Sequence, residues 1–249
     1  MTAAGKSPAG GQARVAVVTG AGRGIGRAVA LELARDGYAL CLAARSRDEL
    51  EETRSQTGLA PGRALIVLVD LAGDEAPGNL ISAALDCYGH IDVLVNNAGW
   101  APARTPLLKL APADLDRMIT VNLRAPIALT QLAAAAMAAR GAGTIVNVAS
   151  SAAIKAPAGE AVYAATKAGL IAFTRAAFRE LRQSGLKLAV IVPGLVDTAL
   201  IPNNKRLDRA AMLSTGDVAQ AVMQIVNSPA GACPVEVTLE PQRDPERQG

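Results

Sequence analysis

The sequence has few of the residues from which metal sites, disulfide frameworks and nucleic-acid surfaces are built. Its 249 residues include one histidine, His90, and three cysteines, Cys41, Cys87 and Cys233, which lie far apart without a CxxC pair. We therefore expect reduced thiols and no metal site. Aromatic residues make up 2% of the chain, and basic tracts interleaved with aromatics are missing, which argues against nucleic-acid binding.

Long apolar runs are missing as well. No run approaches the roughly 18 residues that cross a bilayer, and residues 1–12 are too polar for a signal peptide. We therefore expect no membrane association, a disordered lead-in over residues 1–12 and a cytoplasmic location. The net charge of +3 comes from dispersed residues of both signs and adds no support for a nucleic-acid partner.

Aliphatic residues are abundant in the sequence, since 51% of its residues are hydrophobic and only 2% are aromatic. Unbroken runs of Val, Ile and Leu are typical of parallel strands covered by helices. Seven such runs alternate with helical patterns, at residues 15–18, 39–44, 63–69, 91–95, 143–149, 186–192 and 235–239. This predicts an α/β fold, a doubly wound seven-stranded parallel sheet with helices on both faces, in one domain over residues 13–240 with a flexible tail over 241–249.

A glycine-rich turn follows the first of these runs. Gly20, Gly24 and Gly26 stand between the strand and a helical pattern that carries apolar residues at Ile25 and Val29. Glycines let the backbone turn tightly and approach a pyrophosphate, to which the helix N-terminus presents free amides and the positive end of its dipole. The pattern predicts a dinucleotide site.

Two arginines indicate which dinucleotide is bound. In dinucleotide-binding folds, the end of the second strand meets the adenosine ribose. An acidic residue there binds a free 2′-hydroxyl, whereas an arginine accommodates a 2′-phosphate. This strand is followed by Arg45, with no carboxylate before Asp48, and Arg23 in the glycine turn can point to the same place. Because guanidinium groups bind phosphate bidentately, we predict NADP(H) rather than NAD(H); the alternative is two solvated surface arginines.

Two polar residues have more than one interpretation. Asp70, at the end of the third strand, either accepts a hydrogen bond from an adenine amine or caps the following turn. Asn122 lies inside a long helical pattern over residues 112–140, where an unpartnered Asn is unfavourable, so it is either exposed or holds a water. Pro126 removes a backbone donor four residues later, which predicts a kink that frees the Asn122 carbonyl.

Tyr163 and Lys167 are the pair that most strongly indicates catalysis. In the helix predicted from residue 161 they are i and i+4 neighbours on one face. A cation beside a phenol favours the phenolate and lowers a pKa that is normally near 10, which predicts a general acid/base. Ser150, thirteen residues before Tyr163, follows the fifth strand at the same sheet edge. The alternative is an ordinary helix surface, because this spacing also arises by chance.

Together these motifs resemble those of the short-chain dehydrogenase/reductase superfamily, over residues 15–237. The matching motifs are TGAGRGIG from Thr19, Asp70, NNAG from Asn96, Asn122, Ser150, Tyr163-x-x-x-Lys167, and Pro193-Gly194 with Thr198. The resemblance implies a single-domain Rossmann fold and NADPH-dependent reduction of a ketone or aldehyde, or the reverse oxidation of an alcohol. The family's usual spacing selects Ser150 over Ser151.

The resemblance also implies a role for each matching residue. Asn122, Ser150, Tyr163 and Lys167 would form a catalytic tetrad: Tyr163 the general acid, Ser150 on the substrate carbonyl, Lys167 on the nicotinamide ribose, and Asn122 positioning a water that relays protons. Thr198 would bind the carboxamide. The cofactor-binding residues would be Gly20, Arg23, Gly24, Ile25, Gly26, Arg45, Ser46, Asp70, Leu71, Asn97, Ala98, Gly99, Tyr163, Lys167, Pro193, Gly194, Val196 and Thr198.

The partners implied by the resemblance are a small carbonyl or alcohol substrate and further copies of the chain, packed through the two long helices around residues 112–140 and 161–184. The C-terminus lacks the Asp-Gly-Gly ending of many relatives, so a dimer is better supported than a tetramer. One alternative is a non-catalytic NADP(H)-binding sensor or scaffold, which should have lost Tyr163 or Lys167. A sugar-nucleotide epimerase would need a further substrate domain, for which 249 residues leave no room.

Overall fold

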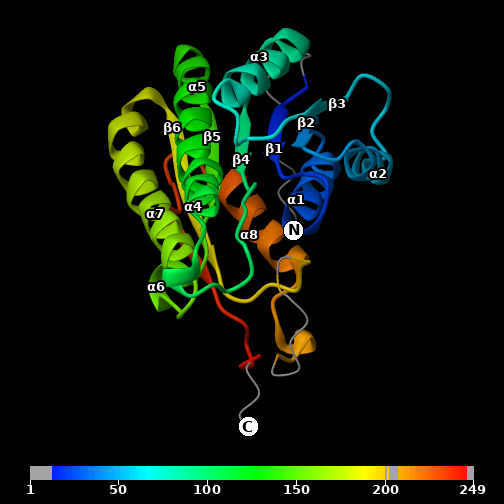
Figure 1. Ribbon diagram of the computed structural model, residues 1–249. Helices are drawn as coiled ribbons and strands as arrows, with labels where there is room; N and C mark the ends of the chain where they lie inside the picture. The colour runs from blue at the N-terminus through cyan, green and yellow to red at the C-terminus, as the bar shows by residue number, and fades with distance from the viewer. Residues whose placement is uncertain (1–12, 200, 202–206, 246–249) are drawn as a thin grey trace.

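The computed structural model describes residues 13–199, 201 and 207–245, and its centre is a seven-stranded sheet (Figure 1). Each neighbouring pair of strands is parallel, in the order β3-β2-β1-β4-β5-β6-β7. The predicted doubly wound parallel sheet is therefore confirmed. The strands are β1 (Val15–Thr19), β2 (Ala39–Ala44), β3 (Ala64–Leu68), β4 (Val93–Asn96), β5 (Gly143–Val148), β6 (Leu186–Pro193) and β7 (Glu236–Leu239).

Helices cover both faces of this sheet (Figure 1). On one face lie α1 (Gly24–Arg35), α2 (Arg47–Thr57) and α8 (Thr215–Val226). On the other lie α3 (Ala76–Tyr88), α5 (Ala125–Arg140) and α7 (Ala161–Leu181). Central strand residues such as Val17 and Ile145 are 0% exposed, because both of their faces are covered, and this is why the strands read as unbroken apolar runs.

The helix predicted over residues 112–140 has three parts. α4 (Pro112–Ile119) and α5 are joined by a π-helical turn at Thr120–Arg124, in which the amide of Ala125 donates to the carbonyl of Thr120, five residues earlier. Pro126 has no amide hydrogen to offer the carbonyl of Asn122. The irregularity that the sequence predicts at Asn122 thus takes the form of a widened turn.

The two ends of the chain are described only in part. Residues 1–12 and 246–249 lie outside the described residues, so the disordered lead-in and the flexible tail stay predictions. Within the predicted tail over residues 241–249, Pro245 is buried and its carbonyl accepts a hydrogen bond from the amide of Asp208 at 2.8 Å. None of the described helices is long and apolar enough to span a membrane.

Candidate active site

The residues singled out from the sequence lie at the carboxyl ends of six adjacent strands of the sheet. Tyr163 and Lys167 reach this edge from α7, and Asn122 comes from the π-helical turn. Gly20 to Gly26 follow β1, Arg45 and Ser46 follow β2, Asp70 and Leu71 follow β3, Asn97 to Gly99 follow β4, Ser150 follows β5, and Gly194, Val196 and Thr198 follow Pro193 at the end of β6.

The glycine turn is packed too tightly for larger residues. At Gly20, where φ is 65°, a methyl group would lie 2.8 Å from Nδ2 of Asn97, and one at Gly26 would lie 2.1 Å from the Gly20 carbonyl oxygen. The Asn97 amide group donates to the carbonyl of Thr19 at 3.0 Å. The Thr19 hydroxyl oxygen in turn accepts from the amides of Asn97 and Ala98, both at 3.0 Å. Asn97 and Ala98 therefore fix the turn against β1.

Two residues without a sequence signal support this turn from the protein side. The Thr53 hydroxyl donates to the carbonyl of Ala21 at 2.9 Å, and Nε of Arg27 donates to the carbonyl of Gly22 at 3.0 Å. Thr53 is 0% exposed, on α2, and Arg27 lies on α1. The carbonyl groups of the turn are thus hydrogen-bonded within the protein. A threonine and an arginine on surface helices give no hint of this in the sequence.

The two arginines of the predicted 2′-phosphate site are both exposed. Arg23 forms an ion pair with Glu49, with 3.3 Å between Nη1 and Oε1. Arg45 forms no hydrogen bond or ion pair with other described residues. Ser46 caps α2, its hydroxyl accepting from the amide of Glu49 at 3.4 Å.

In this structure Asp70 caps the turn that follows β3, which is one of the two interpretations of its place in the sequence. Its Oδ1 accepts from the amide of Ala72 at 3.1 Å, which caps the turn after β3, and its Oδ2 pairs with Arg117 at 3.1 Å. The Arg117 guanidinium also lies over the ring of Trp100, 5.3 Å from its centroid. The side chain of the neighbouring Leu71 is buried in the core.

The four residues of the expected tetrad lie together. The Ser150 hydroxyl lies beside the Tyr163 phenol and acts to lower its pKa. Lys167 is 4% exposed, and its ammonium lies 5.8 Å from the centroid of the Tyr163 ring. Asn122 is 0% exposed; a methyl group on Gly99 would lie 3.4 Å from its Oδ1 and 3.6 Å from Nζ of Lys167.

Asn122 holds the chain that follows β4. Its Oδ1 accepts from the amide of Trp100 and its Nδ2 donates to the carbonyl of the same residue, both at 2.7 Å. The side-chain amide therefore has its partners in the protein, which explains a buried Asn in a helix.

A family model for short chain dehydrogenases matches residues 14–208. The chain belongs to the short-chain dehydrogenase family. Uncharacterised oxidoreductases of Staphylococcus aureus and Staphylococcus epidermidis are each 32% identical to it over 228 residues, 92% of this chain and 97% of theirs. A solved metagenomic short-chain oxidoreductase in complex with NADP is 33% identical, with a TM-score of 0.82 over 94% of this chain and 99% of that one. Levodione reductase is 26% identical, with a TM-score of 0.84 over 92% and 96%.

In this short-chain dehydrogenase the pKa of Tyr163 differs from our prediction. We expected Lys167 to lower it. Burial instead raises the pKa of Tyr163 above its usual value; the hydrogen bond with Ser150 opposes this rise, and the charge of Glu160 adds to it. Burial also lowers the pKa of Lys167 to about 8. Tyr163 and Lys167 are one helical turn apart on α7, as their spacing predicts, but desolvation of the phenol decides the direction in which its pKa moves.

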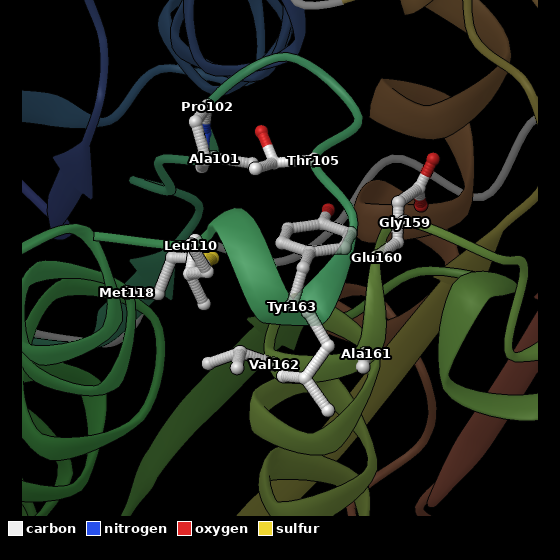
Figure 2. Close-up of a pocket in the computed structure, with 11 residues that line it drawn as sticks. Ala101, Pro102, Thr105, Leu110, Met118, Gly159, Glu160, Ala161, Val162 and Tyr163 are labelled. Atoms are coloured by element: carbon white, nitrogen blue, oxygen red, sulfur yellow. The ribbon is translucent and has the colours of Figure 1, made fainter. Parts of the chain in front are cut away.

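The dehydrogenase has a largely apolar pocket beside Tyr163. Figure 2 shows the Tyr163 ring projecting between Leu110 and Met118 on one side and the Gly159–Glu160 segment on the other. Residues 101–110, which follow β4, form another part of the pocket wall. This segment has no regular apolar period, so the sequence does not indicate that it lines a pocket. The described residues that line the pocket are Ala101, Pro102, Thr105, Leu107, Leu110, Met118, Gly159, Glu160, Ala161, Val162 and Tyr163.

Two polar contacts link the walls of this pocket. Nε of Arg104 donates to Oε1 of Glu160 at 2.6 Å, and the amide of Thr105 donates to the carbonyl of Gly159 at 3.0 Å. Gly159 has φ of 82°, and a methyl group there would lie 3.3 Å from Cβ of Arg104. The loop before α7 and the segment after β4 are therefore joined at the pocket wall next to Tyr163.

Proposed function

We propose that this short-chain dehydrogenase transfers hydride between NADP(H) and a ketone or aldehyde, whose reduced form is an alcohol, with Tyr163 as general acid/base. The observation that carries the proposal is that the Tyr163 phenol lines a pocket, with the Ser150 hydroxyl beside it and the buried ammonium of Lys167 one helical turn further along α7. A proton donor at the wall of a pocket, with a second hydroxyl beside it, suits a carbonyl oxygen.

The residues fit a dinucleotide cofactor. The glycine turn approaches β4 so closely that side chains are excluded, and α1 begins at Gly24 with its amides directed to the sheet edge. Arg23, in the turn after β1, and Arg45, after β2, would flank the adenosine ribose, where guanidinium groups suit a 2′-phosphate. The solved relative with bound NADP supports the same choice. What a nicotinamide cofactor supplies is hydride donation or acceptance.

For carbonyl reduction, Ser150 would donate a hydrogen bond to the carbonyl oxygen and Tyr163 would give it a proton as negative charge develops. Such preorganised donors stabilise the transition state, and general acid catalysis contributes roughly 10²–10⁴-fold. Because burial raises the pKa of Tyr163, the phenol is protonated at neutral pH, as reduction requires.

Lys167 and Asn122 would support this proton transfer. One N–H of Lys167 is taken by the carbonyl of Val148, which leaves two donors for ribose hydroxyls and for a water. The side chain of Asn122 is occupied by Trp100, so the group that would hold the relaying water is its main-chain carbonyl, deprived of an α-helical partner by Pro126.

The pocket favours an uncharged carbonyl compound with apolar substituents. Ala101, Pro102, Leu110, Met118 and Val162 offer no hydrogen bonds from their side chains. The one acid in the lining, Glu160, is paired with Arg104.

A panel of carbonyl compounds tests the proposal, with oxidation of NADPH and of NADH followed by absorbance. We expect turnover with at least one apolar ketone or aldehyde and a higher kcat/KM with NADPH. An equal or higher value with NADH would overturn the assignment of NADP(H). Binding of NADPH without turnover of any carbonyl or alcohol would favour the sensor or scaffold.

A further inference from the structure

Glu49 places a carboxylate beside the predicted 2′-phosphate site. It lies in the first turn of α2, with Oε1 3.3 Å from Nη1 of Arg23. A methyl group on Gly22 would lie 3.0 Å from its Oε2, so the carboxylate abuts the glycine turn itself. The amide of Glu49 donates to the Ser46 hydroxyl, which caps α2 and fixes the main chain there. The position of Glu49 is thus set by the fold.

This ion pair contributes little to the stability of the protein. The side chains of Arg23 and Glu49 are 64% and 36% exposed, and an ion pair in water contributes little to folding. The consequence for a ligand is larger, because Arg23 is one of two guanidinium groups at the site. A phosphate carries close to two negative charges near neutral pH, so it is repelled by a carboxylate that a ribose hydroxyl would instead use as an acceptor.

We propose that Glu49 limits the preference of this enzyme for a 2′-phosphate. The carboxylate holds Arg23 in the ligand-free protein and repels the phosphate that would replace it, while it accepts a hydrogen bond from a free 2′-hydroxyl. Arg45, which makes no ion pair with the described residues, supplies the opposing attraction. This inference rests on the dinucleotide site of the proposed function.

The test compares two mononucleotides that differ only in the 2′-phosphate, adenosine 2′,5′-bisphosphate and 5′-AMP, by calorimetry without turnover. For Glu49→Gln we expect about threefold to tenfold tighter binding of the bisphosphate at low salt, from the removal of one unit charge near the phosphate. Binding of 5′-AMP should stay unchanged or weaken. High salt should reduce the gain, because the site is exposed.

Two further variants test whether the effect comes from the charge at position 49. One changes the length of that side chain, and the other changes the net charge of the protein at a different position. Glu49→Asp keeps the carboxylate and should bind the bisphosphate with about the wild-type affinity, within roughly twofold. Glu32→Gln removes the same charge from α1, where Glu32 pairs with Arg35 instead of the glycine turn, and should leave both affinities unchanged. Melting temperatures of all variants establish that each is folded.

Each outcome is decisive. Unchanged or weaker binding of the bisphosphate by folded Glu49→Gln overturns the role of Glu49. An equal gain for both mononucleotides also overturns it, because the effect would then not concern the 2′-phosphate. Wild-type protein that binds neither mononucleotide and neither NADPH nor NADH contradicts the proposed function itself; wild-type protein that binds NADPH, together with an unaffected Glu49→Gln variant, contradicts only the role of Glu49.

Discussion

The ammonium of Lys167 donates a hydrogen bond to the main-chain carbonyl of Val148, with 2.9 Å between Nζ and O. Val148 is the last residue of β5, two positions before Ser150. The cation on α7 is therefore tied to the strand that delivers the serine. This tie fixes the helix that carries Tyr163 relative to Ser150.

Because Lys167 is buried, its charge should make the stability of the protein depend on pH. The pKa of Lys167 is lowered from 10.5 to about 8, so between these values the unfolded chain binds more protons than the native protein, and the free energy of unfolding rises with pH. Relative to Lys167→Met, the wild type should gain about 2 kcal/mol between about pH 7 and pH 9.5. Urea unfolding of both proteins measures this difference. Parallel pH curves would contradict it.

The two adjacent serines should differ strongly in their importance. Ser150→Ala removes the hydroxyl beside the Tyr163 phenol, and we expect a loss of kcat of roughly 10²–10³-fold. Ser151, which is 9% exposed and directly precedes the short helix α6 (Ala152–Lys155), provides the matched control. Ser151→Ala should retain most of the turnover. The reverse ranking, measured on folded variants, would show that Ser151 is the catalytic serine.

Glu160 should tune the pH profile of the reaction. Its charge raises the pKa of Tyr163, so Glu160→Gln should lower that pKa. Carbonyl reduction needs the protonated phenol and declines as the pH rises through this pKa; the decline should therefore move to lower pH in the variant. Rate–pH profiles of the two enzymes test this. A decline that stays in place or moves to higher pH would contradict it.

Arg104 offers the opposite change at the same ion pair. Its guanidinium lies against Glu160, and Arg104→Ala leaves the carboxylate uncompensated. The pKa of Tyr163 should then rise, and the decline of the reduction rate should move to higher pH. Shifts of the two variants in the same direction would mean that pocket geometry, and not charge, is responsible.

The strands could be predicted because both faces of the sheet are covered. Residues such as Val17, Leu94 and Ile145 are buried whichever face they point to, so each strand is an unbroken apolar run. By contrast, α2 was not predicted, because Leu50 and Thr53 are its only buried residues and an apolar period is almost absent. A helix can be recognised from its sequence only when apolar residues recur over several turns, and in α2 they do not.

The catalytic side chains could be placed by motif, but their environment could not. Spacing put Tyr163 and Lys167 on one helix face, which the structure confirms. It did not indicate that Lys167 bonds to Val148, or that burial raises the pKa of Tyr163. The support given by Arg27 and Thr53 to the glycine turn and the pocket wall from Ala101 to Leu110 depend on tertiary packing between segments distant in sequence.

The central claim, that Tyr163 gives its proton to the substrate, is tested most directly by Tyr163→Phe. The measurement is kcat with the best carbonyl substrate of the panel, together with the Kd for NADPH of the same preparation. We predict a loss of kcat of roughly a hundredfold or more, with a Kd within about threefold of the wild-type value. A variant that binds NADPH and retains more than about a tenth of the wild-type kcat would contradict the claim.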